Sequence, residues 1–200
     1  GLFSRAIHQS SGSAITNRST QQEHTILGIE LAKTLLSTET DDLADQLRAV
    51  SAERVINVAE EVYSGHYFDV AVDGQSVYEA FGDTLKAKNL HTVELLVGSN
   101  EHESLMYLDK NQTVDGWLES QMGSEEANKL RQMIDHIPNG RDQLNSLSTA
   151  ASFMCPDLTL AEEISKMEGT SWFYFFNRQR EGEVAASMGA YHGAELPYIF

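Results

Sequence analysis

The spacing of apolar residues along the chain predicts helices that alternate with short buried strands. Residues 5–10 are predicted to form a short strand that ends at Ser11 and Gly12. Apolar residues then recur at helical spacing over residues 22–36. Two further helices are predicted from the same periodicity. The first carries Leu43, Leu47 and Val50, and the second carries Val55, Val58, Ala59 and Val62.

Two compact apolar runs in the second half of the chain are the best strand candidates. Residues 93–98 end in a glycine and are typical of a buried parallel strand. Residues 172–176 are all aromatic and are predicted to be a strand that contributes to the core. Strands that alternate with helices favour an α/β sheet, and the long helical excursions leave only a few strands visible. We therefore expect part of a mostly parallel sheet.

Helices are predicted between these two runs from capping patterns and apolar stripes. Ser124 is expected to cap one helix, with two glutamates in its first turn. Thr159 and Glu162 have the spacing of a capping box, which predicts the start of another helix. The apolar stripe of the first of these helices is predicted to be Leu130, Met133 and Ile134.

Composition and charge narrow the possible partners. The chain has 200 residues, with 14 Lys and Arg against 30 Asp and Glu, which gives a net charge of −16. This acidity disfavours nucleic acid and anionic membrane surfaces as partners. No apolar run is long enough to span a bilayer, so no membrane span is expected. No signal peptide is visible at the first residues, and both a secreted and a cytoplasmic location stay open.

Two polar segments follow the predicted strands, and in open parallel sheets active sites lie beyond the carboxyl ends of strands. Residues 98–104 offer carboxylates, and residues 189–198 offer a histidine between glycines. A carboxylate that orients an imidazole is the acid–base half of a hydrolase triad. A metal site is a less favoured reading of the same residue types. It would use Glu101, His102, Glu103 and His192.

Five stretches of the chain, in order, resemble motifs of the type-B carboxylesterases, the cholinesterase branch of the α/β-hydrolases. Residues 2–12 resemble LFxRAIxQSG, and residues 68–74 resemble FxPVVDG. Residues 97–104 resemble the strand end and acid motif iGvNkDEG, and residues 173–176 resemble YxYxF. Residues 192–200 resemble HGxElpyvFg. The resemblance covers the chain from end to end and implies a partial α/β-hydrolase fold.

The resemblance implies a carboxylic ester hydrolase of the serine esterase or lipase type. It places Glu103 on the catalytic acid, His192 on the catalytic base and Glu195 in a supporting role behind the histidine. These enzymes keep the chain order Ser, acid, His, and need no metal or organic cofactor. No Gly-x-Ser-x-Gly elbow occurs in the 200 residues, so the resemblance implies a nucleophile upstream.

The missing elbow gives the expected domain organisation. Residues 1–200 are expected to be a single segment of one catalytic domain that is incomplete at both ends. Such a segment is expected to require the rest of the hydrolase domain and to be inactive alone. Its substrate is then a small-molecule ester. The acyl and alcohol preferences, like the oligomeric state, cannot be read from the sequence.

Several alternatives stay open at this stage. The acid of the motif has altered neighbours, His102 and Ser104, and Glu101 is a competing carboxylate. His102 could also tune the acid. The altered flanks favour, as an alternative function, a catalytically silent cholinesterase-like adhesion or binding protein, and a third candidate is an unrelated helical binding module. The single cysteine, Cys155, excludes an internal disulfide, and a buried free thiol or a disulfide to a residue beyond the chain are both possible.

Overall fold

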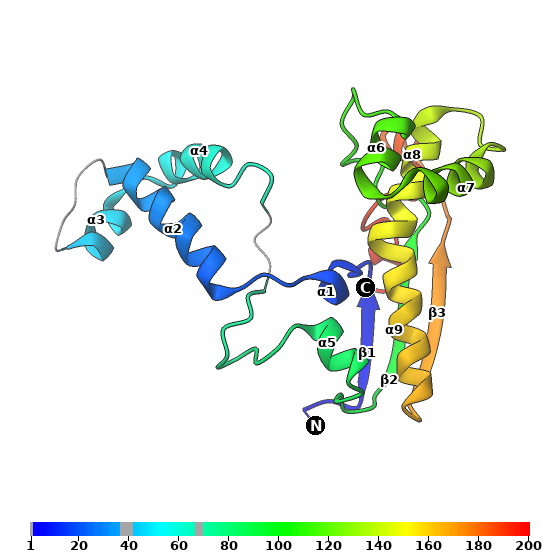
Figure 1. Cartoon of the computed structure of the whole chain (residues 1–200), viewed down its shortest axis with the longest axis horizontal. Helices are drawn as coiled ribbons and strands as arrows, with labels where there is room; N and C mark the ends of the chain where they lie inside the picture. The colour runs from blue at the N-terminus through cyan, green and yellow to red at the C-terminus, as the bar shows by residue number, and fades with distance from the viewer. Residues whose placement is uncertain (1, 37–41, 67–69) are drawn as a thin grey trace. The chain divides into compact units, whose positions relative to one another are not determined.

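The computed structural model describes residues 2–36, 42–66 and 70–200. Within them the chain forms two compact units (Figure 1). One combines the residues before position 17 with residues 84–200, and the other is Asn17–Asp83. The motif at residues 68–74 begins with Phe68 and Asp69, which lie outside the described residues.

The first unit is built on a parallel sheet of three strands. These strands are β1 (Arg5–Gln9), β2 (Glu94–Asn100) and β3 (Thr170–Phe176), in the order β1-β2-β3. In register, Gln9 lies opposite Gly98, and Gly98 lies opposite Tyr174. A Cβ atom at Gly98 would overlap the carbonyl oxygen of Tyr174, so only glycine permits this close approach of the strands. All three strands follow the sequence prediction.

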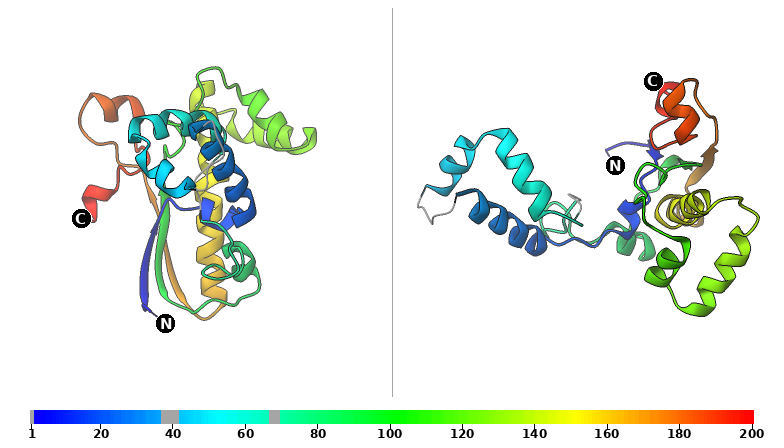
Figure 2. Two further views of the ribbon diagram at one scale, coloured as in Figure 1. Left: turned by 90° about the vertical axis from the view of Figure 1, so that its left-hand side faces the viewer. Right: turned by 90° about the horizontal axis from the view of Figure 1, so that it is seen from above.

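Helices of the first unit cover the sheet and extend beyond its carboxyl edge. Helix α9 (Cys155–Lys166) packs along β2 and β3, and the left view of Figure 2 shows it beside the strands. Figure 1 shows α6, α7 and α8 beyond the carboxyl ends of the strands. The remaining elements of this unit are α1 (Ser13–Thr16), α6 (Val114–Gln121), α7 (Ser124–Ile134), α8 (Gly140–Thr149), the π-helix η1 (Ala150–Met154), α10 (Glu183–Met188) and the 3₁₀ helix η2 (Leu196–Tyr198).

The apolar core of the first unit has two parts. Between α9 and β2, Val97, Leu160 and Ile164 are buried. A second cluster fills the space between α6, α7 and α8. Its buried members are Leu105, Leu108, Trp117, Leu118, Ala127, Ile134, Leu144 and Leu147. The second cluster supports the segment that leaves β2, because Leu105 and Leu108 belong to that segment.

The second unit is helical. It contains α2 (Gln21–Leu36), α3 (Leu43–Ala49) and α4 (Ala52–Val62), and α5 (Phe81–Lys86) begins at its end. The three predicted helices are confirmed, and Val58 is buried on the predicted face of α4. A capping box starts α2, because Thr20 N donates to Glu23 Oε2 at 2.7 Å and Glu23 N donates to Thr20 Oγ1 at 3.3 Å.

Two predicted helix starts are wrong. Helix α7 begins at Ser124 itself, with Gly123 at the N-cap and no capping side chain. Helix α9 begins at Cys155, four residues before Thr159, whose hydroxyl donates to the Cys155 carbonyl from inside the helix. Because α9 continues directly from the π-helix η1, with Met154 in a helical conformation, it needs no polar cap and the capping-box spacing does not mark its start.

Some residues predicted to be buried are exposed. Met133 is 67% exposed, while Leu130 and Ile134 face the core as predicted. In β3, Trp172 is 54% exposed, so the prediction that the aromatic run lies in the core is wrong for this chain. Helix α9 packs on one face of the sheet, and Trp172 projects on the other face. Cys155 is exposed rather than a buried thiol.

Candidate active site

Three segments converge at the carboxyl edge of the sheet because all three strands run parallel. Ser10 follows β1, and residues 101–104 follow β2. The loop at residues 189–195 comes after β3 and α10, and its backbone pairs with the β2 segment: His102 N donates to the Ala190 carbonyl at 3.0 Å. The two polar segments singled out in the sequence therefore lie together.

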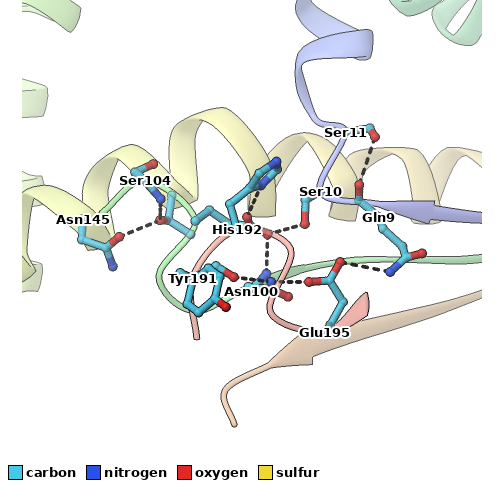
Figure 3. A network of polar contacts seen from close by, with 11 residues as sticks. Gln9, Ser10, Ser11, Asn100, Ser104, Asn145, Tyr191, His192 and Glu195 are labelled. Carbon is cyan, nitrogen blue, oxygen red and sulfur yellow. Dashed lines mark hydrogen bonds and ion pairs between the residues drawn. The ribbon is translucent and has the colours of Figure 1, made fainter. Parts of the chain in front are cut away.

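The Glu103 carboxylate lies at the centre of this cluster and is fully buried. Its Oε2 lies 2.6 Å from Nδ1 of His192. Its Oε1 accepts a hydrogen bond from the Asn100 backbone N–H at 2.6 Å and another from the Ser10 hydroxyl. The charge of this buried carboxylate is thus met by three donors, which is what burial of an ionised group requires. Figure 3 shows these contacts around His192.

Ser10 reaches Glu103 from an unusual backbone conformation. Its φ is 52°, in the left-handed region that residues with a Cβ seldom adopt. Its own N–H donates to the Gly98 carbonyl at 2.9 Å, which holds it at the end of β1. Strain of this kind persists only where surrounding contacts fix it, and it gathers at functional sites.

The His192 imidazole is held between a carboxylate and two aromatic rings. The Tyr107 ring lies 5.9 Å away in an edge arrangement, and the Phe153 ring lies 5.5 Å away. The hydrogen bond with Glu103 raises the pKa of His192 above its ordinary value, against the opposing effect of partial burial. With Nδ1 bound to the carboxylate, Nε2 is the nitrogen that can accept a proton from a neighbouring group.

Glu195 ties the histidine loop to two strands. Its side chain is buried and accepts hydrogen bonds from Gln9 Nε2 at 3.0 Å and from Asn100 Nδ2 at 2.5 Å. Asn100 Nδ2 also donates to the Tyr191 carbonyl at 2.8 Å, next to His192. These contacts, drawn in Figure 3, join the ends of β1 and β2 to the loop. A supporting role for Glu195 stays a prediction.

Glu101 and His102 lie beside the cluster and do not contact the imidazole of His192 through any described ion pair or hydrogen bond. The Glu101 side chain is exposed and faces His102, with Oε2 3.7 Å from Nδ1. His102 Nδ1 also accepts from the Ala190 N–H at 3.2 Å. Gly189 packs against this ring with φ at 61°, where a Cβ atom would come within 2.5 Å of Nδ1. His102 therefore supports the loop, and Glu103 is the carboxylate that meets His192.

The β2 segment is also fixed to α8. Asn145 Nδ2 donates to the Glu101 carbonyl at 3.0 Å. The Ser104 N–H donates to Thr149 Oγ1 at 3.2 Å, and Thr149 donates in turn to Asn145 Oδ1. These contacts bracket Glu103 on both sides along the chain. Glu103 is thus positioned by regular secondary structure as well as by its own partners.

A model of the carboxylesterase family matches residues 1–200. The chain belongs to the carboxylesterase family. Its fold is similar to the crystal structure of EstA from Aspergillus niger, with a TM-score of 0.73 and 20% identity over 100% of this chain and 42% of that one. Two structures of PNB esterase are similar too, with TM-scores of 0.71 and 0.66 and identities of 20% and 19%. They cover 100% and 99% of this chain and 41% and 43% of theirs.

The carboxylesterase family membership confirms the resemblance, and the solved structures confirm the partial α/β-hydrolase fold. The chain spans about two fifths of the length of these esterases. No curated protein sequence matches the chain. In the described part of the chain, no three His, Cys, Asp or Glu side chains gather as metal ligands would. No helix there is both long and apolar enough to cross a membrane.

For several residues that contact Glu103, His192 or Glu195, the sequence analysis predicted no role in the site. Ser10 and Asn100 are polar residues at the ends of predicted strands, so the rule that selected the acid could have selected them too. Gln9 lies one residue before the end of the strand predicted at residues 5–10. For Tyr107 and Phe153 the sequence holds no signal, because their contact with His192 depends on the tertiary packing of α8, η1 and the loop.

Proposed function

We propose that the full-length protein hydrolyses carboxylic esters, with Glu103 and His192 as the acid and base of a Ser-Glu-His triad. The observation that carries this proposal is the 2.6 Å contact between Glu103 Oε2 and His192 Nδ1, formed by a fully buried carboxylate. Membership of the carboxylesterase family supports a small-molecule ester as the substrate class. The nucleophilic serine lies outside these 200 residues, which contain no Gly-x-Ser-x-Gly sequence.

In the proposed reaction, Nε2 of His192 removes the proton of the serine hydroxyl while the serine oxygen forms a bond to the ester carbonyl carbon. The same nitrogen then gives this proton to the alkoxy oxygen, whose bond to carbon breaks, and the alcohol leaves. A water molecule repeats the sequence on the acyl-enzyme: it loses a proton to Nε2 and adds to the carbonyl carbon. The serine oxygen takes the proton back as the carboxylic acid departs.

The role of Glu103 in this mechanism is to select one tautomer of His192. A carboxylate at Nδ1 keeps the proton there, so that the lone pair is on Nε2. Once Nε2 is protonated, the negative charge of Glu103 stabilises the imidazolium. The two other donors to Glu103, Ser10 and Asn100, hold the carboxylate in place without contacting the imidazole.

The test uses a fluorophosphonate probe and ester turnover on the full-length protein. Replacing the base, His192→Ala, should lower ester turnover to near background, because general acid–base catalysis is lost. His136→Ala, which changes an exposed histidine, is the matched control and should leave turnover unchanged. Undiminished turnover in the His192 variant would remove the assignment. A wild-type protein that neither labels nor turns over esters would favour the silent adhesion protein instead.

The probe also tests the organisation that we propose for the chain. Fluorophosphonates modify an activated serine, and the proposed nucleophile is absent from residues 1–200. We expect the full-length protein to be labelled, while the polypeptide of residues 1–200 alone should stay unlabelled and inactive. Labelling of a serine within residues 1–200 would show that the nucleophile has been placed wrongly.

A further inference from the structure

A second contact between a buried carboxylate and an imidazole lies near the proposed site. Asp157 on α9 is fully buried, and its Oδ1 lies 3.4 Å from Nε2 of His8 on β1. Among the described residues, neither oxygen of Asp157 has a partner at hydrogen-bonding geometry. Burial raises the pKa of Asp157, and the contact with His8 opposes that rise. The proposed mechanism gives these two residues no role.

His8 and Asp157 lie on the two segments that contact Glu103 and His192, respectively. His8 comes two residues before Ser10, whose hydroxyl binds Glu103. Asp157 comes four residues after Phe153, whose ring packs against His192. The same two segments also touch directly, since a Cβ atom at Gly12 would overlap the carbonyl oxygen of Ser152 in η1. The contact between His8 and Asp157 therefore links the segment whose Ser10 binds Glu103 to the segment whose Phe153 packs against His192.

We propose that His8 and Asp157 are a positioning pair for Glu103 and His192, an inference that rests on the proposed function. The fully buried Asp157 carboxylate attracts the His8 imidazole 3.4 Å away, so their contact favours a close separation of β1 and α9. Apolar packing would also join β1 to α9, but without this attraction between two particular side chains. Misplacement of catalytic groups by about 1 Å can cost 10²-fold in rate, so this separation matters to catalysis.

Charge gives the pair a second effect on Glu103. The negative charges of Asp157 and Glu103 interact unfavourably, and the nearby His8 opposes the rise in the pKa of Asp157. A charge on Asp157 therefore acts on the carboxylate that binds His192. The other groups near His192 are the Glu195 carboxylate and the rings of Tyr107 and Phe153. The Tyr174 hydroxyl interacts with the carboxylates of Glu195, Glu103 and Asp157.

The first test is Asp157→Asn in the full-length protein, which keeps the shape of the side chain and removes its charge. We expect kcat to fall roughly tenfold or more while KM changes little, because Asp157 does not touch the proposed substrate site. The acid limb of the kcat/KM profile should move to lower pH, because a loosened Glu103 raises the pKa of His192 less. NMR titration of labelled histidines measures the same pKa without substrate. The positioning inference can therefore be judged even if the protein proves to have no esterase activity.

The second test separates positioning from stability. The double variant His8→Leu/Asp157→Leu lacks both the buried carboxylate and the partly buried imidazole, so its denaturation midpoint should equal or exceed that of the wild type. We nevertheless expect its kcat and its His192 pKa to stay low, as in Asp157→Asn. Lys166→Ala, which removes an exposed ion pair on the same helix, is the control and should change neither quantity. If either Asp157 variant keeps the wild-type kcat and the wild-type His192 pKa, the inference is overturned. If Asp157→Asn does not fold, the double variant alone decides.

Discussion

Glu103→Gln tests the proposed acid most directly, because glutamine has the same shape as glutamate and carries no charge. In the wild type, Oε1 accepts from the Asn100 N–H and the Ser10 hydroxyl, and Oε2 meets His192. Glutamine replaces one of these oxygens by an NH₂ group, which can only donate. Placing that group beside the Asn100 N–H would set two donors against each other in a buried site. The NH₂ group is therefore expected to face His192.

An NH₂ group at this position donates to Nδ1 of His192 and leaves the imidazole proton on Nε2. That tautomer cannot accept a proton from serine. The equivalent change in a Ser-His-Asp triad lowers kcat by about 10⁴-fold. This corresponds to about 5 kcal/mol of lost transition-state stabilisation, at 1.36 kcal/mol for each factor of ten. We expect a loss of that order in Glu103→Gln, with KM nearly unchanged.

The assay is steady-state hydrolysis of a chromogenic ester by the full-length protein. Glu101→Gln is the matched control, because that carboxylate is exposed and contacts His102. Its kcat should stay close to the wild-type value. If Glu103→Gln keeps a tenth or more of the wild-type kcat, or if Glu101→Gln loses as much as Glu103→Gln, the reasoning from the 2.6 Å contact is refuted.

The further predictions concern pH and stability. The raised pKa of His192 keeps the imidazole protonated to a higher pH, so the acid limb of kcat/KM should lie above the ordinary value of about 6.5. The stability that this raised pKa contributes should be present at low pH and fall as pH rises through it, which pH-dependent denaturation measures. Gly189→Ala should destabilise the protein by about 1–3 kcal/mol, because the new Cβ meets the His102 ring at a positive φ. Gly28→Ala, in an open position of α2, should instead stabilise by up to about 1 kcal/mol. Leu118→Ala should cost about 2–5 kcal/mol, since this side chain is fully buried among α6, α7 and α8. Urea denaturation checks these three substitutions.

The strands and the main contact of the site could be predicted from the sequence because local signals agree there. The apolar run that becomes β2 ends in glycine, and the polar segment that follows it contains Glu103. The rule that parallel strands place their carboxyl ends at one edge then brings this segment to His192. The family motifs added the choice of Glu103 over Glu101, which residue types alone left open.

Details that depend on tertiary packing could not be predicted. Thr159 and Glu162 have capping-box spacing, yet α9 starts at Cys155 and continues from the π-helix η1 without a polar cap. The aromatic residues of β3 have high strand propensity, which predicted the strand but not which face would be covered. The link from Glu195 to Asn100 joins positions 95 residues apart, and no local pattern encodes such a contact.

The buried carboxylates of the first unit differ in how many partners they have, and this difference bears on the role of Asp157. Glu103 has three partners and Glu195 has two side-chain donors, whereas Asp157 has one imidazole at 3.4 Å. Because the pKa of Asp157 is raised in the folded state, stability falls as pH rises from the ordinary carboxyl value through the raised one. At neutral pH the residue is therefore a cost to folding, which a leucine would avoid. A buried charge with this cost needs a role other than stability. Asp157 lies between the segments that hold Glu103 and His192, and positioning these two residues is the role that we propose. The double leucine variant should accordingly be as stable as the wild type and have a lower kcat.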